Sequence, residues 1–199
     1  MGQDSRRRGF ERLRELADGP YVAQAIEFAR KFLERFPDHA AGWTRLGMSL
    51  TAVARYQEAE LAYASALLNC AKEYRYLVLS QLGHAARSSG NYTEAASWYR
   101  KAIAAAPDNA GNYIFLGAVL AKQGRFAEAE SAHRAATQCP EGCIDEAYLN
   151  LGLIFRAQER FEESAECFRE AIRRDPDYCV AKEALLDVKR VLIARRRKS

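Results

Sequence analysis

The residues whose types and spacing come closest to a chemical site are Cys139 and Cys143, with His133 six residues before them. Thiolates and imidazoles are ligands that zinc prefers, usually as four ligands in two close pairs. No second pair lies near these residues in the sequence. The chain has five cysteines, an odd number, and begins without a secretory signal segment. We therefore expect free thiols in a reducing cytoplasm and no metal site.

The sequence contains no motif that indicates catalysis. Its glycines stand singly rather than in a phosphate-binding loop, no His-Glu-x-x-His motif occurs, and no serine lies in a nucleophile elbow. Acidic runs such as Glu162-Glu163 are typical of the solvated face of a helix. These observations predict a protein that is not an enzyme and needs no cofactor.

The sequence does contain a pattern that repeats along most of its length. Four Leu-Gly pairs occur at intervals of 36, 34 and 35 residues, and an aromatic residue follows each glycine by nine positions. The pairs and their aromatic residues are Leu46-Gly47 with Tyr56, Leu82-Gly83 with Tyr92, Leu116-Gly117 with Phe126, and Leu151-Gly152 with Phe161. A period of this size predicts a solenoid of stacked units.

Each copy has the apolar spacing of two α-helices. In the first copy, Trp43, Leu46-Gly47 and Leu50 lie at i, i+3, i+4 and i+7, which is one stripe of a helix. A second stripe follows a short break and comprises Tyr56, Ala59, Tyr63 and Ala66. Each unit is therefore expected to be a helical hairpin. Glycine and alanine would lie where the two backbones approach closely, and His133 would pack in a column of aromatic residues.

This pattern resembles that of the tetratricopeptide repeat family, which has Trp, Leu-Gly, Tyr, Ala, Phe, Ala and a closing Pro over 34 residues. The closing proline occurs as Pro107 and Pro176, and one place early as Pro140, whereas Ala71 and two extra residues follow the first full copy. The resemblance implies an all-α fold, a right-handed superhelical solenoid of antiparallel helix hairpins. Its four repeats would span 40–75, 76–109, 110–144 and 145–178 within residues 40–178.

The remaining segments fit the ends of such an array. Residues 10–39 read as a degenerate first repeat that lacks the Leu-Gly pair, and 179–194 read as one amphipathic capping helix. We expect residues 1–9 to be a disordered basic N-terminus and 195–199 to be a basic tail. Self-association through an open end of the solenoid is compatible with this organisation.

Charge and hydropathy leave two kinds of partner open. The formal net charge is +4, to which residues 1–8 contribute +2 and 195–199 contribute +4, leaving 4 − 6 = −2 for the rest. The basic ends could be solvated termini, or they could contact nucleic acid, which is the alternative function. A negative body argues against a groove that follows phosphates, so nucleic acid is the less favoured partner. No run of eighteen apolar residues occurs, so we expect no membrane span and a cytoplasmic protein.

The resemblance places function on a concave wall formed by the first helix of each hairpin. The residues expected to form this partner-binding groove are Thr44, Arg45, Met48, Gln81, His84, Arg87, Ile114, Phe115, Lys122, Asn150, Leu153 and Arg156. Ile114, Phe115, Leu149 and Leu153 would form an apolar strip with basic neighbours, which suits a segment with apolar anchors and acidic groups. The open alternative is that some of these residues pack between neighbouring repeats.

One subtype of the family can be tested against the sequence. Members that bind the acidic tails of cytosolic chaperones use a carboxylate clamp of Lys, Asn, Asn, Lys and Arg on three consecutive first helices. The corresponding places hold Thr44, Met48, Gln81, Gly111 and Phe115, and a frame one repeat later holds Ser80, His84, Phe115, Glu146 and Asn150. Neither set matches. The sequence therefore predicts a non-enzymatic adaptor that binds a protein or peptide segment of a different kind.

Overall fold

The computed structural model describes residues 2–197, and within that range the chain is helical and contains no β-strand. One isolated parallel bridge joins Asn109 to Glu141. The chain divides into two compact units, Met1–Ala105 and Ala106–Ser199. In the described part, no helix is both long and apolar enough to cross a membrane. The all-α fold expected from the sequence is confirmed.

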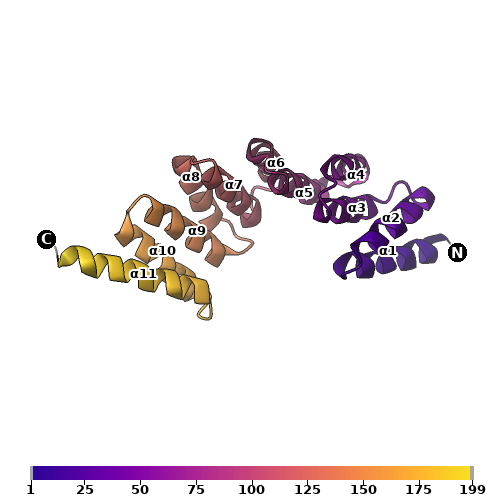
Figure 1. Ribbon diagram of the computed structural model, residues 1–199. Coiled ribbons are helices and arrows are strands. Elements are labelled where there is room, and N and C mark those ends of the chain that lie inside the picture. The colour runs from indigo at the N-terminus through magenta and orange to yellow at the C-terminus, as the bar shows by residue number, and fades with distance from the viewer. Residues whose placement is uncertain (1, 198–199) are drawn as a thin grey trace. The chain divides into compact units, whose positions relative to one another are not determined.

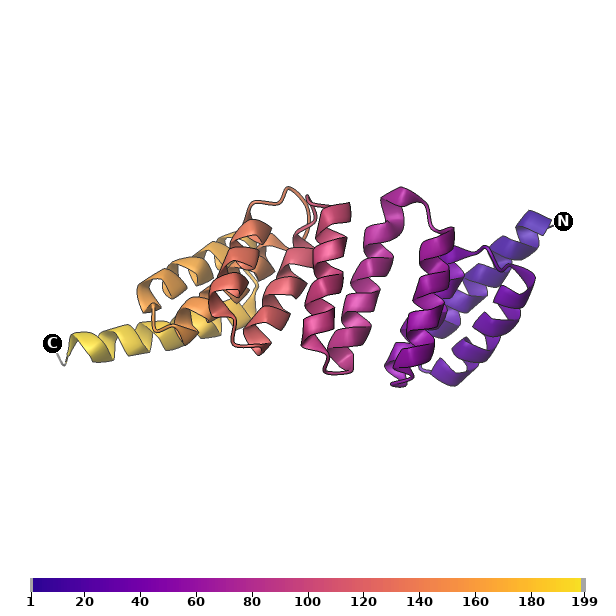
Figure 2. The ribbon, with the colours of Figure 1, turned by 90° about the horizontal axis from the view of Figure 1, so that it is seen from above.

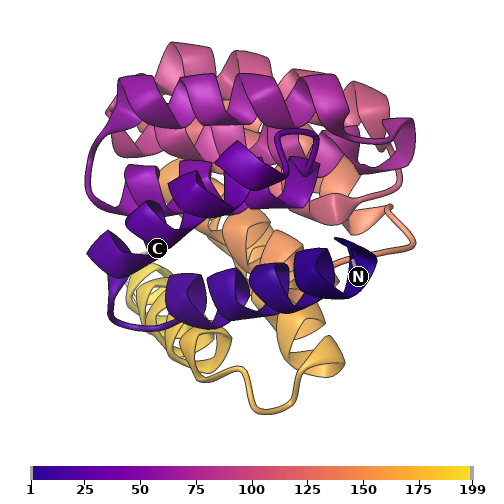
Figure 3. The same cartoon turned by 90° about the vertical axis from the view of Figure 1, so that its right-hand side faces the viewer.

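Unit 1 consists of three helical hairpins (Figure 1). Its helices are α1 (Gly2–Asp18), α2 (Val22–Arg35), α3 (Ala40–Ala52), α4 (Tyr56–Asn69), α5 (Arg75–Ser88) and α6 (Tyr92–Ala105), with a short 3-10 helix, η1 (Lys72–Tyr74), before α5. The pair α1 and α2 lies side by side in indigo (Figure 3). One continuous core, which includes Leu13, Phe32 and Leu50, runs through the first two hairpins and reaches Leu82 on α5.

Unit 2 consists of two hairpins and a final helix that lies along the last hairpin (Figure 2). Its helices are α7 (Ala110–Lys122), α8 (Phe126–Thr137), α9 (Ile144–Ala157), α10 (Phe161–Arg174) and α11 (Cys179–Arg196). Ala181, Leu185 and Val188 of α11 pack with Phe168 of α10 and Leu149 of α9. The last helix therefore covers the apolar side that the final hairpin would otherwise expose to water.

The Leu-Gly pairs mark the closest approach of the two helices in each hairpin. A Cβ atom built on Gly47 would lie 2.5 Å from Tyr63, and one on Gly152 would lie 2.6 Å from Phe168. A Cβ atom built on Gly117 would lie 2.5 Å from His133, whose side chain is only 1% exposed. Only a residue without a side chain lets an aromatic ring lie against the facing backbone at this distance. The packed histidine that the sequence indicated is confirmed.

The ends of the chain differ from the sequence expectation. Residues 2–9, expected to be a disordered basic N-terminus, form the first part of α1, which continues through Asp18. Ion pairs support the start of α1, including Arg8 with Asp4 and Arg6 with Asp38 of the connection between α2 and α3. Helix α11 begins at the expected Cys179 but continues to Arg196, two residues beyond the predicted end. Residues 198 and 199 of the expected basic tail lie outside the described residues.

Candidate functional site

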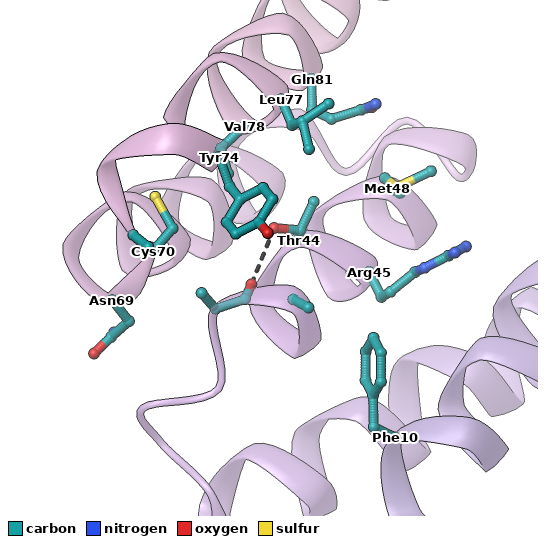
Figure 4. Close-up of a pocket in the computed structure, with 13 residues that line it drawn as sticks. Phe10, Thr44, Arg45, Met48, Asn69, Cys70, Tyr74, Leu77, Val78 and Gln81 are labelled. Atoms are coloured by element: carbon teal, nitrogen blue, oxygen red, sulfur yellow. Dashed lines mark hydrogen bonds between the residues drawn. The ribbon is translucent and has the colours of Figure 1, made fainter. Parts of the chain in front are cut away.

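Unit 1 contains a pocket of about 540 Å³ (Figure 4). It is formed by α1, α3, α5 and the connection between α4 and α5. The residues that line it are Phe10, Ala40, Ala41, Thr44, Arg45, Met48, Asn69, Cys70, Ala71, Tyr74, Leu77, Val78 and Gln81. First helices of three consecutive hairpins thus contribute to one site.

Helical spacing explains why these side chains face the same space. Ala41, Thr44, Arg45 and Met48 lie at i, i+3, i+4 and i+7 of α3, on the side opposite Leu46 and Leu50. Leu77 and Gln81 lie one turn apart on α5 and face them across the pocket (Figure 4). The hydroxyl of Thr44 donates to the carbonyl oxygen of Ala40 at 3.0 Å, so its methyl group is free to line the pocket.

The pocket wall is largely apolar and open to solvent. Met48 is 37% exposed, Leu77 47% and Tyr74 59%, although all three are large apolar side chains. Half-buried Cys70 and buried Val78 complete this wall. Apolar side chains that remain exposed in a concave site are a common mark of binding surfaces.

Two polar side chains at the pocket differ in their availability to a ligand. The guanidinium of Arg45 is largely covered and forms a charge-assisted hydrogen bond with Asp18 at the end of α1. A ligand carboxylate would have to compete with Asp18 for this group. Gln81 forms no ion pair or hydrogen bond with other described residues, and its amide can both donate and accept.

The next two predicted groove residues on α5 do not line the pocket. His84 turns toward the second helix of its own hairpin, where its Nδ1 lies 2.9 Å from the hydroxyl of Tyr99. Burial, with a smaller contribution from the charge of Arg87, lowers the pKa of His84 to about 4. Arg87 is exposed one turn further along the helix. His84 is thus held toward Tyr99 of its own hairpin, and its place in the binding wall stays a prediction.

Two of the four residues expected to form an apolar strip in unit 2 are buried. Ile114 is 2% exposed and packs with Ala136 of α8 and Ala147 of α9, and Leu149 is 6% exposed. Leu153 is half-buried against the core that α11 closes. Neighbouring helices of the stack cover Ile114 and Leu149, so these two residues are not available to a partner. This outcome corresponds to the alternative of packing between repeats.

The remaining predicted residues of unit 2 do not form an apolar groove either. Phe115 and Asn150 are half-buried, whereas Lys122 and Arg156 are exposed. Of the predicted groove residues, the pocket brings together Thr44, Arg45, Met48 and Gln81. Sequence analysis missed Phe10, which comes from the degenerate first repeat, and Tyr74, which the extra residues after the first full repeat place at the rim.

The cysteine loop of unit 2 has contacts that belong to packing. The thiol of Cys139 lies 3.5 Å from the carbonyl oxygen of Ala135 and 3.8 Å from that of Pro107, whereas Cys143 is exposed. Burial raises the pKa of Cys139, which disfavours its thiolate form. Among the described residues, no group of three or more histidines, cysteines or carboxylates is placed to hold a metal ion.

Comparison with known sequences supports the repeat assignment. Residues 83–124 match the model of the TPR repeat and residues 145–178 match that of the tetratricopeptide repeat. The chain is 30% identical over 116 residues to protein O-mannosyl-transferase Tmtc3 of Drosophila melanogaster and 32% identical over 95 residues to human tetratricopeptide repeat protein 7B. These alignments cover 51% and 48% of the chain but span only 12% and 11% of the relatives.

Solved structures share the fold. A tetratricopeptide repeat protein from Parabacteroides merdae has a TM-score of 0.73 at 19% identity, with 98% of this chain and 76% of that chain covered. YrrB, described as a TPR protein with an unusual peptide-binding site, has a TM-score of 0.64 at 22% identity, with 86% and 87% covered. The first TPR of Spaghetti (RPAP3), bound to an HSP90 peptide, has a TM-score of 0.57 at 24% identity, with 61% and 95% covered. The two matching family models show that the chain contains tetratricopeptide repeats, and together with the repeated hairpins they support its assignment to the tetratricopeptide repeat family, whose fold these neighbours share.

Proposed function

We propose that this chain is a protein-interaction module that binds a segment of a partner protein in the pocket of unit 1. The observation that carries the proposal is the exposure of Met48, Leu77 and Tyr74 in one concave site of about 540 Å³. A pocket of this size accommodates one or two large side chains of a partner segment. Burying one such side chain contributes about 1.5–3 kcal/mol to binding. The module acts by binding, without catalysis and without a cofactor.

The partner segment has an apolar anchor and a polar neighbour. The anchor occupies the space between Phe10, Met48 and Leu77, and Gln81 hydrogen-bonds the backbone of the segment. An acidic group on the segment reaches Arg45 only by replacing Asp18 in their ion pair. Acidic groups therefore add less to affinity than the apolar anchor does.

This mode of binding differs from recognition of a chaperone tail. The RPAP3 repeat domain, which shares the fold, is bound to an HSP90 peptide. The places that correspond to a carboxylate clamp hold Thr44, Met48 and Gln81 in unit 1, none of which is a cation. We infer a cytoplasmic adaptor that recognises an apolar anchor instead of an acidic tail.

The alternative of nucleic-acid binding has less support. Each arginine of the N-terminal basic run forms an ion pair with a carboxylate: Arg6 with Asp38, Arg7 with Glu11, and Arg8 with Asp4. These charges are thus already matched within unit 1, which reduces their attraction for phosphates.

Methionine labelling tests the proposal directly, because the chain has two methionines and one of them, Met48, lines the pocket. Peptides would be selected from a displayed random library against the full chain and titrated into protein labelled with ¹³C at the methionine methyl groups. We expect selected peptides to carry a large apolar residue and to shift the Met48 signal.

Two variants give the control. Leu77→Glu places a charge in the pocket and should abolish both peptide binding and the Met48 shift. Leu68→Glu places the same charge at an exposed position of α4 outside the pocket and should change neither. Peptides that bind equally well to Leu77→Glu would refute the pocket as the binding site.

A further inference from the structure

Helix α4 has a second apolar face that the repeat does not bury. Its core side carries Ala59, Tyr63 and Ala66, which are at most 1% exposed. On the opposite side, Leu61 is 70% exposed and Leu68 is 86% exposed. The two leucines are seven residues apart, so they lie on one face of the helix. Figure 1 shows α4 and α6 on one side of unit 1 and α3 and α5 on the other.

The other repeats show that these leucines are not part of the repeat pattern. At the places that correspond to Leu61 and Leu68, the next three copies hold Ser97 and Ala104, Ser131 and Gln138, and Glu166 and Arg173. The second helices of the other repeats therefore pack in the stack with small, polar or charged residues at these two places. Packing within the hairpin therefore does not explain why α4 has leucine at both places.

A shallow groove of about 290 Å³ lies beside this face, between α4 and α6. Leu61, Leu67, Leu82 and Trp98 provide its apolar lining. Trp98 occupies a place that Ala62, Ala132 and Cys167 take in the other copies, so a large ring is present only here in that column.

Two carboxylates border the groove, and they differ in their hydrogen-bond partners. Glu94 accepts hydrogen bonds from Trp98 at 3.2 Å and Asn91 at 2.7 Å. Glu60 forms no hydrogen bond or ion pair with any described residue. Partial burial, and then repulsion by Glu94, raise the pKa of Glu60. A basic group next to Glu60 would oppose both effects by stabilising the charged carboxylate.

The exposed side of α11 carries the complementary features. Leu186 is 50% exposed and Ile193 is 53% exposed, and they too are seven residues apart. Lys189 and Arg190 lie between them. The side chain of Lys189, like that of Glu60, forms no ion pair or hydrogen bond with other described residues, so the two opposite charges are available to each other.

We propose that α11 of a second copy of this chain docks along the outer face of α4, which is defined by Glu60, Leu61, Ala64 and Leu68. Leu186 and Ile193 of the second copy pack against Leu61 and Leu68, since both pairs have the same seven-residue spacing. Lys189 of the second copy reaches Glu60. The chain thus self-associates through two different surfaces, the outer face of α4 on one copy and the exposed side of α11 on the other. It is weak, because a pair of helices buries less area than a stable interface does.

Sedimentation velocity over a wide concentration series of the full chain tests this proposal. The wild-type sedimentation coefficient should rise with concentration. The variant Leu61→Ser with Leu68→Gln, which carries the residues of the third repeat, should self-associate about tenfold more weakly or not at all. The variant Leu186→Ser with Ile193→Gln should behave in the same way. Circular dichroism establishes that the variants remain folded.

A charge exchange tests the orientation of the two surfaces. Glu60→Lys and Lys189→Glu should each weaken self-association, and an equimolar mixture of the two variants should recover it, because each supplies the surface that matches the other. In protein labelled with 5-fluorotryptophan, the ¹⁹F signal of Trp98 should shift with concentration while that of Trp43 stays constant. A wild-type chain that stays monomeric at every concentration, or association that survives the leucine substitutions, would overturn the proposal.

Discussion

At the scale of single residues, the hairpin turns show how the repeat tolerates backbone strain. Ala54, Gly90, Gly124 and Glu159 occupy equivalent places between first and second helices, and all have positive φ, at 59°, 83°, 74° and 58° respectively. Two copies use glycine, which adopts this conformation without strain. The other two use residues with a Cβ atom, for which the left-handed region costs about 1–2 kcal/mol.

Exchanging residue types at this turn should therefore change stability in opposite directions. We expect Ala54→Gly to raise the free energy of unfolding by about 0.5–1 kcal/mol and Gly124→Ala to lower it by about 1 kcal/mol. No atom lies within 4 Å of a Cβ at Gly124, so only the backbone is affected there. Urea denaturation measures both changes. Ala52→Gly, at an exposed position of α3, is the control and should lower the free energy of unfolding. Destabilisation by Ala54→Gly would contradict this account.

His133 makes the stability of unit 2 depend on pH. Its side chain is 1% exposed, its Nδ1 has no hydrogen-bond partner among the described residues, and burial lowers its pKa to about 4. The pKa in the unfolded chain is about 6.5. The folded state therefore binds this proton less well, so stability is complete above pH ~6.5 and is lost as the pH falls toward 4.

Replacing His133 should remove the part of the stability loss at low pH that this histidine causes. A shift from about 6.5 to 4 corresponds to a loss of about 3 kcal/mol across that window. We expect His133→Phe, the residue type of Phe168 in the fourth repeat, to flatten the pH dependence of the urea midpoint between pH ~6.5 and 4. His84, whose pKa is also lowered to about 4, remains in this variant, so some dependence persists. An unchanged pH profile would show that His133 is not responsible.

At the scale of elements, the sequence predicts the helices well and their outer surfaces poorly. The Leu-Gly pairs predicted four hairpins because Gly47 and its equivalents must meet an aromatic ring within the same hairpin. The burial of Ile114 depends instead on α9, which lies about one repeat away in sequence. Likewise, Phe10 reached the pocket from a helix without the repeat pattern. Residues that contact neighbouring repeats are specified by the stack, and a single repeat pattern does not reveal them.

This difference between core and pocket predicts contrasting effects of two similar substitutions. Ile114→Ala should lower the free energy of unfolding by about 2–4 kcal/mol, because it leaves a cavity among Ala110, Ala136 and Ala147. Leu77→Ala removes a 47% exposed side chain and should change stability by less than about 1 kcal/mol while weakening peptide binding. Thermal melts and the Met48 titration measure the two properties. Strong destabilisation by Leu77→Ala would show that Leu77 belongs to the core.

At the scale of the whole molecule, the proposed functions use different sides of the same hairpins. The pocket draws on first helices α3 and α5, whereas the outer face belongs to second helix α4. The core between them is close-packed, with Leu50 at 2% and Tyr63 at 1% exposure. Two ligands influence each other only if each prefers a different state of the protein. A packed core with small residues at its contacts offers no second arrangement for either ligand to select.

We therefore expect the two binding events to be independent. A peptide that saturates the Met48 signal should leave the concentration dependence of sedimentation unchanged, and Leu61→Ser with Leu68→Gln should bind the peptide with the wild-type dissociation constant. Met48 and Trp98 report on the two surfaces separately in one sample, since Met48 lines the pocket and Trp98 lines the outer groove. A shift of Trp98 on peptide addition at low protein concentration, where self-association is negligible, would instead show that the hairpin transmits a change from one side to the other. In that case binding of a partner segment would control self-association, and by linkage the peptide affinity would rise or fall by the same factor on association.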